Sequence, residues 1–271
     1  MAKYNKLAGK HVLVIGGSSG IGRGVVECAI EGGAALVTLT GSSPQSASRA
    51  LAEVQASYPS TIPTPTTATA TATQVAAFAC DLSQDSVEAD LEKLFVEAEK
   101  AQPIDHVVLT AADALRISEP KDIELAQVRQ AARFRMEVPL LLGKVAGRHL
   151  ARSSACSLTL STGGIADQPS AGWSVVAFLG AGIAGLTRNL ALDLKPVRVN
   201  AVEPGFVNTG LWRATGLTEE QVAAQVEAVA ERMPTGRAAE VEDVAEAYVY
   251  LMKDRNATGE IVKTRSGANL I

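Results

Sequence analysis

The chain has 271 residues, of which 47% are hydrophobic and 20% are charged, and its formal net charge at pH 7 is -4. This length and composition predict a single globular domain with a substantial buried core over residues 1–271. The slightly acidic balance gives no electrostatic reason to expect a nucleic-acid partner.

The ends and apolar segments of the chain give no sign of export or of membrane insertion. The first residues are polar, and the longest apolar run, residues 175–186, is shorter than the roughly 20 residues that cross a bilayer. The three cysteines lie far apart in apolar contexts, as expected of reduced core thiols. The histidines have no metal-ligand spacing. We therefore expect a cytoplasmic protein with no membrane partner and no metal site.

Strand-like runs alternate with helix-like segments along almost the whole chain. Such alternation predicts a doubly wound α/β fold, in which seven parallel strands in the order 3-2-1-4-5-6-7 carry helices on both faces. Residues 57–74 are rich in Pro, Thr and Ala and have no apolar period, so we interpret them as a flexible surface insertion rather than a domain linker. The predicted strands are residues 11–15, 35–40, 75–80, 106–110, 157–161, 197–202 and 260–264.

The first predicted strand runs into the sequence GGSSGIG, residues 16–22, and then into a helical segment. Glycine permits positive φ and lets a pyrophosphate approach the backbone, and the following helix offers unpaired amide groups. Glycine motifs also occur in ordinary tight turns, but the strand before and the helix after favour a dinucleotide-binding turn here. The residues expected to contact the cofactor are Gly16, Ser18, Ser19, Gly20, Ile21 and Gly22.

The second predicted strand ends in Gly41, Ser42 and Ser43, where an acidic residue would bind the hydroxyls of an NAD ribose. No carboxylate stands there. Ser42 and Ser43, with the backbone amides, can receive a 2′-phosphate, so we predict NADP(H) as the cofactor; the alternative is an ordinary serine-rich turn. Arg49 is the nearest candidate cation.

Several further motifs follow the glycine turn: CDLS at residues 80–83, LTAAD at 109–113, RVNAVEPGFVNT at 198–209 and PTGRAAEVEDVAEAYVYLM at 234–252. In sequence and order they resemble the motifs of the short-chain dehydrogenase/reductase family over nearly the whole chain. The resemblance implies a Rossmann-type fold. It also implies cofactor contacts from Asp81, Leu82, Ala111, Ala112, Pro204, Gly205, Val207 and Thr209.

The resemblance also implies a proton relay made of a serine, a tyrosine and a lysine one helical turn later. In that relay the tyrosine passes a proton to the developing alkoxide, while the lysine lowers the tyrosine's pKa and binds the ribose. An ungapped alignment of GLTRNLALDL places Val176 at the tyrosine position and Gly180 at the lysine position, and the serine position falls at Thr162 or Gly163. The chain's four tyrosines all lie outside this segment.

A pocket without this relay either binds its ligands without redox chemistry or transfers hydride to an acceptor that needs no proton, such as an iminium ion. The second case resembles a fungal group, the malbrancheamide- and paraherquamide-type reductase/Diels-Alderases of indole alkaloid biosynthesis. That resemblance implies NADPH-dependent reduction of a cyclic iminium, followed by a Diels-Alder cycloaddition. It implies Arg135 and Trp173 as catalytic residues. The group's aspartate is replaced by Ser170, so we predict that Asp167 stabilises the cation.

Each of these residues has a second interpretation. Trp173 can anchor its loop instead of stacking on a polycyclic substrate, Arg135 can pair with Glu137 or another acid, and Asp167 can be an ordinary turn residue. Asp113, after the fourth strand, is a further candidate acid.

We expect an NADPH-dependent oxidoreductase that acts on a small polycyclic molecule as a homo-oligomer, either a dimer or a tetramer. The alternatives are an ordinary carbonyl reductase of the same family and a catalytically inactive dinucleotide-binding regulator or partner protein.

Overall fold

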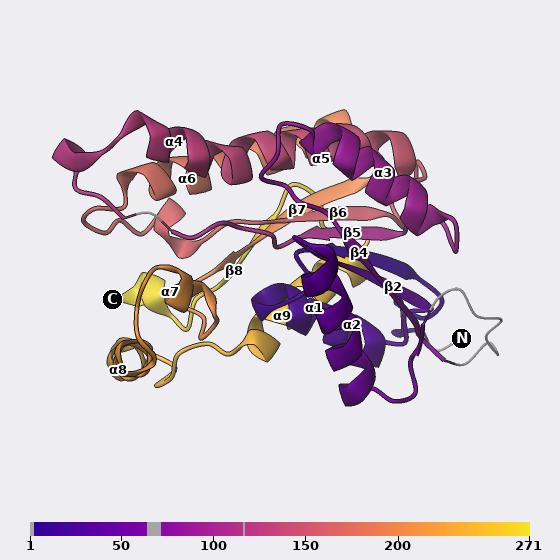
Figure 1. Cartoon of the computed structure of the whole chain (residues 1–271), viewed down its shortest axis with the longest axis horizontal. Coiled ribbons are helices and arrows are strands. Elements are labelled where there is room, and N and C mark those ends of the chain that lie inside the picture. The colour runs from indigo at the N-terminus through magenta and orange to yellow at the C-terminus, as the bar shows by residue number, and fades with distance from the viewer. Residues whose placement is uncertain (1–2, 64–71, 116) are drawn as a thin grey trace.

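The computed structural model describes residues 3–63, 72–115 and 117–271, and their strands form one parallel sheet (Figure 1). The strands are β1 (His11–Ile15), β2 (Leu36–Gly41), β3 (Ile62–Pro63), β4 (Gln74–Ala79), β5 (His106–Leu109), β6 (Ser157–Ser161), β7 (Arg198–Pro204) and β8 (Ile261–Thr264). Their order in the sheet is β3-β4-β2-β1-β5-β6-β7-β8.

The predicted strand order is confirmed, because the seven predicted strands correspond to every strand except β3. That two-residue strand pairs with β4 at the edge of the sheet and lies within the predicted insertion 57–74. The first residue of that insertion, Ser57, still belongs to a helix. Residues 64–71 of the insertion lie outside the described residues.

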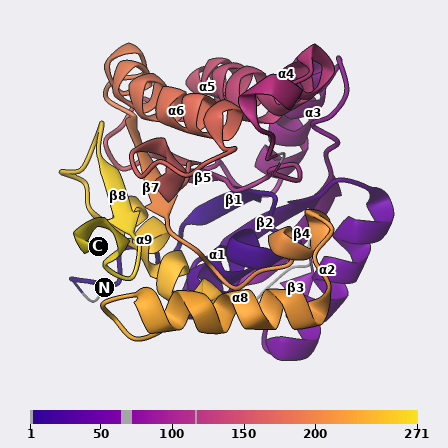
Figure 2. The same cartoon turned by 90° about the vertical axis from the view of Figure 1, so that its left-hand side faces the viewer.

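Helices cover both faces of the sheet (Figures 1 and 2). One core lies under α3, α5 and α6, and the other lies under α1, α2 and α9. Neighbouring strand residues point to opposite cores, so that Leu13 of β1 belongs to the first and Val14 to the second, as expected of a parallel sheet buried on both faces. The α-helices are α1 (Gly20–Glu31), α2 (Pro44–Ser57), α3 (Val87–Glu99), α4 (Leu125–Ala132), α5 (Val138–His149), α6 (Ser174–Asp193), α7 (Leu211–Ala214), α8 (Glu219–Arg232) and α9 (Val241–Lys253).

Shorter helical turns connect several of these elements. A π-helical turn, η2 (Arg133–Glu137), joins α4 to α5, and the 3-10 turns are η1 (Pro120–Asp122), η3 (Gly164–Ala166) and η4 (Ala268–Leu270). Helix α8 has no buried residue, and Figures 1 and 2 show it at the edge of the molecule beside α7.

Helix α6 is the one described helix whose length and mean hydropathy, 1.6, would suffice for a membrane span. Ile183 and Leu190 pack into the core under α6, so its apolar character follows in part from its place on the sheet. Phe178 and Leu192 are exposed on its outer face.

The turn between β1 and α1 lies directly against the loop that follows β5. Gly16 has φ +92°, and a Cβ atom there would lie 2.4 Å from the Ala111 nitrogen and 2.7 Å from the Ala111 Cα. A Cβ at Gly22 would lie 2.2 Å from the Gly16 oxygen. Glycine is therefore required at both positions, at Gly22 because of the close backbone approach and at Gly16 because of its positive φ as well.

We expect Gly16→Ala to destabilise the protein more than Gly236→Ala does. Gly236 also has positive φ, +70°, but a Cβ added there would have no atom within 4 Å, so its substitution costs only the strain of a left-handed residue, about 1–2 kcal/mol. Gly16→Ala adds a collision with the Ala111 backbone. Urea unfolding followed by circular dichroism measures both losses, and equal losses would contradict the proposed steric constraint.

Candidate functional site

A cavity of about 390 Å³ opens at the carboxyl ends of β1, β2, β4 and β5. Strand order reverses at β1, which lies between β2 and β5, and such a switch point is where parallel α/β sheets bind ligands. The cavity is lined by Gly16, Ser18, Ser19, Gly20, Ile21, Gly22, Thr40, Gly41, Ser42, Cys80, Asp81, Leu82, Thr110, Ala111, Ala112, Asp113, Ala114, Phe134, Thr209, Gly210 and Leu211.

The middle of the cavity is formed by the N-terminus of α1. Ser19 is the N-cap residue but makes no side-chain capping hydrogen bond, and the first turn of α1 contains no acidic residue. The amide groups of this turn and the positive end of the helix dipole therefore face the cavity without a carboxylate competing for them. These features suit the pyrophosphate of a dinucleotide.

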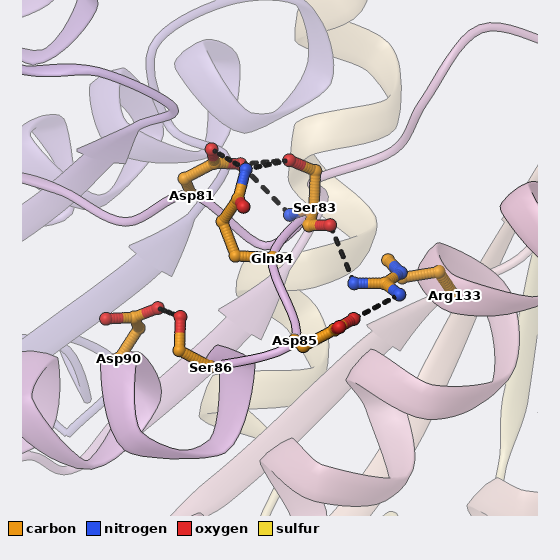
Figure 3. A network of polar contacts seen from close by, with 7 residues as sticks. All are labelled: Asp81, Ser83, Gln84, Asp85, Ser86, Asp90 and Arg133. Carbon is orange, nitrogen blue, oxygen red and sulfur yellow. Dashed lines mark hydrogen bonds and ion pairs between the residues drawn. The ribbon is translucent and has the colours of Figure 1, made fainter.

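One end of the cavity is formed by the turn after β4, shown in Figure 3. One carboxylate oxygen of Asp81 accepts hydrogen bonds from the amide and hydroxyl of Ser83, at 3.0 and 2.7 Å, and the other accepts one from the Gln84 side chain at 2.9 Å. The hydrogen bond from the Ser83 hydroxyl is the main cause that lowers the pKa of the Asp81 carboxyl below its usual value. Asp81 therefore remains ionised in a fixed orientation at this end.

The end of β2 lies beside the same part of the cavity. Ser42 is exposed and borders the cavity, whereas the Ser43 hydroxyl serves as the N-cap of α2 and accepts a hydrogen bond from the Ser46 amide at 3.2 Å. Of the two serines predicted to bind the 2′-phosphate, Ser42 is therefore the one that is both exposed and part of the cavity wall. Arg49 does not line the cavity and pairs with Glu53 at 3.7 Å.

Pro139, the second residue of α5, explains the π-helical geometry of the turn η2 that precedes it. Pro139 has no amide hydrogen to donate to the carbonyl of residue 135, as a regular helix would require. The Val138 amide instead donates to the Arg133 carbonyl, which is the wider π-helical spacing. Three consecutive residues of this turn lie at or beside the cavity: Arg133 donates to the carbonyl of Ser83, which follows the lining residue Leu82, at 2.7 Å (Figure 3), Phe134 lines the cavity, and Arg135 contacts the lining residue Asp113.

Arg135 and Asp113 form an ion pair at the wall of the cavity. Their side chains are 13% and 8% exposed, and Arg135 Nη1 donates to Asp113 Oδ1. Arg135 Nη2 also donates to the Asp113 carbonyl at 3.3 Å. The partner of Arg135 is thus an acid other than Glu137. The second carboxylate oxygen, Asp113 Oδ2, is buried and accepts no hydrogen bond from the described residues.

The other two predicted catalytic residues do not line this cavity. Asp167 pairs with Lys263 and, at 2.7 Å, with Arg265 Nη1; these cations, Lys263 foremost, lower the pKa of the Asp167 carboxyl. Arg265 also pairs with the buried Glu203. Trp173 is half-buried just before α6. Of the three predicted residues, Arg135 is the one that forms an ion pair with a residue of the cavity wall, Asp113.

Val176 and Gly180, the residues expected at the tyrosine and lysine positions of the proton relay, lie in packed surroundings on α6. Val176 is 5% exposed, and Thr162 Oγ1 donates a hydrogen bond to the Gly180 carbonyl at 2.8 Å. A Cβ at Gly180 would lie 3.3 Å from that same hydroxyl. Tyr248, on α9, is fully buried and hydrogen-bonded to Ser161 at 2.6 Å, and burial raises the pKa of its hydroxyl. No tyrosine lies among the residues that line the cavity.

Most of the predicted cofactor contacts line the cavity, while Ser43, Pro204, Gly205 and Val207 do not. Gly205 packs against Arg265 instead, and its amide donates to the Thr264 carbonyl at 2.9 Å. Several further residues line the cavity but were not predicted from the sequence. Most of them are neighbours of predicted residues in the chain, and that position was the one sequence feature that could have identified them. The lining residues that were not predicted are Thr40, Cys80, Thr110, Ala114, Phe134, Gly210 and Leu211.

Comparison with known proteins gives consistent results. Residues 3–271 match the family model described as an SDR-like Rossmann domain. The chain is 39% identical to the short-chain dehydrogenase/reductase fsr5 of Gibberella fujikuroi, covering 100% of this chain and 98% of that protein. It is 36% identical to the short-chain dehydrogenase/reductase malC of Malbranchea aurantiaca, covering 96% and 95%.

A solved structure agrees with these relatives. The MalC reductase/Diels-Alderase from Malbranchea aurantiaca superposes with a TM-score of 0.88 at 34% identity, with 99% of each chain covered. Together with the family model, which spans nearly the whole chain, these similarities identify the protein as a member of the short-chain dehydrogenase/reductase family, whose enzymes use NAD(P)H.

Proposed function

We propose that this protein is an NADPH-dependent reductase of a preformed cyclic iminium ion, and that it also guides a Diels-Alder cycloaddition in indole alkaloid biosynthesis. The observation that carries the proposal is the contrast between the two halves of the site. Most of the predicted cofactor contacts line one cavity, whereas Val176 and Gly180, the residues expected at the family's tyrosine and lysine positions, lie in packed surroundings on α6. The similarity to the MalC reductase/Diels-Alderase supports the cycloaddition.

Reduction of an iminium ion does not require the proton relay of serine, tyrosine and lysine. A bound NADPH supplies hydride, and hydride addition to the carbon of a C=N⁺ group yields a neutral amine while the nicotinamide is oxidised. No proton is needed in that step. A ketone would instead give an alkoxide, which needs a proton donor or an equivalent stabilising group. An ordinary carbonyl reductase is therefore the weaker alternative.

Different residues of the chain bind the cofactor and orient the substrate. The first turn of α1 binds the pyrophosphate, and the Asp81 turn and Ser42 receive the adenosine half. Arg135, which is bonded to Asp113, and Trp173 remain the residues predicted to orient the polycyclic substrate, although neither lines this cavity. Asp167 remains the predicted stabiliser of the cation, although Lys263 and Arg265 share its charge.

The direct test measures NADPH oxidation by absorbance with a cyclic iminium and with a ketone of similar size in parallel. We expect turnover of the iminium and at most slow turnover of the ketone. Preference for the ketone would favour the carbonyl reductase, and NADPH binding without turnover of any substrate would favour an inactive dinucleotide-binding protein.

We expect the wild-type protein to bind NADP(H) more tightly than NAD(H), and Ser42→Asp to erase or reverse that preference. Ser42 is exposed at the end of β2, and a carboxylate there would repel the 2′-phosphate. Titration of both cofactors by calorimetry gives the two dissociation constants. Ser48→Asp, which adds the same charge to an exposed residue of α2 outside the cavity wall, is the matched control. Equal affinity of the wild type for both cofactors would contradict the assignment.

Restoring the relay with Val176→Tyr and Gly180→Lys should not accelerate reduction of the iminium. Val176 is buried, and the new Cβ at residue 180 would press on the Thr162 hydroxyl, while the added lysine would repel a cationic substrate. Steady-state rates of the double variant with the iminium, and its unfolding midpoint as a folding control, provide the measurement. A well-folded variant that reduces the iminium several times faster than wild type would show that the relay had merely been lost.

A further inference from the structure

The Asp113 carboxylate has an unused hydrogen-bonding position. Arg135 binds Oδ1, while Oδ2 is buried and accepts no hydrogen bond from the described residues. A buried carboxylate oxygen without a donor is costly, since it has lost its water and gained no replacement. Because Asp113 is part of the cavity wall, a ligand in the cavity that carries a hydrogen-bond donor would satisfy it.

The sheet topology places Asp113 at a defined end of the cavity. Asp113 follows β5, whereas Asp81 and Ser42 follow β4 and β2 on the other side of β1. The pyrophosphate position at the turn after β1 lies between them, so the two nucleosides of a dinucleotide extend to opposite sides. With the adenosine at the Asp81 side, the nicotinamide nucleoside lies at the Asp113 side.

The surroundings of the ion pair point to the same end. The turn η2, which carries Arg135, packs against α6. Gly180 on that helix offers no side-chain donor or acceptor, and the nearest hydroxyl, that of Thr162, is bonded to the Gly180 carbonyl. Asp113 therefore supplies a charged acceptor on this side of the cavity, where Gly180 has no side chain to supply one.

We propose that Asp113 binds the vicinal hydroxyl groups of the nicotinamide ribose, which donate to its Oδ2, and that Arg135 is the positioning residue that fixes Oδ1. The inference rests on the proposed function only in requiring that NADP(H) occupies the cavity. Carboxylates bind ribose hydroxyls with charge-assisted hydrogen bonds, and the fixed orientation of Asp113 reduces the entropy lost on binding.

The test compares two ligands by isothermal titration calorimetry: NADPH, and 2′,5′-ADP, which contains only the adenosine half. For Asp113→Asn we expect about tenfold weaker binding of NADPH, because a neutral amide makes weaker hydrogen bonds with the ribose hydroxyls than a carboxylate does, and unchanged binding of 2′,5′-ADP. Asp105→Asn is the matched control, because Asp105 pairs with Lys10 at 2.7 Å at the amino-terminal edge of the sheet. It should leave the affinity for both ligands unchanged.

A second pair of variants separates positioning from folding. Arg135→Gln should weaken NADPH binding and leave 2′,5′-ADP binding unchanged, whereas Arg135→Lys, which retains a cation for Asp113, should restore most of the NADPH affinity. Unchanged NADPH affinity in Asp113→Asn, or equal loss of both ligands, would overturn the inference about Asp113 alone. Failure of the wild-type protein to bind NADPH would overturn the proposed function with it.

Discussion

The close contact between the turn after β1 and the loop after β5 is the constraint on which the cavity depends. The Ala111 amide donates to the Ile15 carbonyl at 3.0 Å, the Thr110 hydroxyl donates to the Gly16 carbonyl at 3.3 Å, and no Cβ can be accommodated at Gly16. This contact places the start of α1 against the end of β5. The positive end of a helix, the Asp81 turn and Asp113, the partner of Arg135, thereby border one space rather than three separate ones.

The fold was predictable from the sequence because its determinants are local and periodic. Buried strands alternate with amphipathic helices, and the glycines at residues 16 and 22 lie where a strand meets a helix. Each signal is contained in a few neighbouring residues. The edge strand β3 was missed because two residues inside a Pro- and Thr-rich segment carry no period.

The electrostatic pairing of the site was not predictable, since it joins residues far apart in the chain. Glu137 was the obvious nearby partner of Arg135 in the sequence, but residues two positions apart do not face each other on a helix, and Arg135 instead contacts Asp113. Asp167 likewise pairs with cations on and just after β8. The two carboxylates differ accordingly: Asp167 is 44% exposed and shared by two cations, whereas Asp113 is 8% exposed and paired with one. Charge interactions of the second are less screened by water.

The π-helical turn also limits how this region can vary in length. Arg133 contacts the turn after β4, and Arg135, two residues later, contacts the loop after β5, so one short segment spans the two sides of the cavity. Inserting one residue between them would rotate the following side chain by roughly 100° about the helix axis and remove one of the two contacts. Insertions and deletions within η2 are therefore disfavoured, and the spacing of its two arginines is a sequence criterion by which relatives with the same cavity can be recognised.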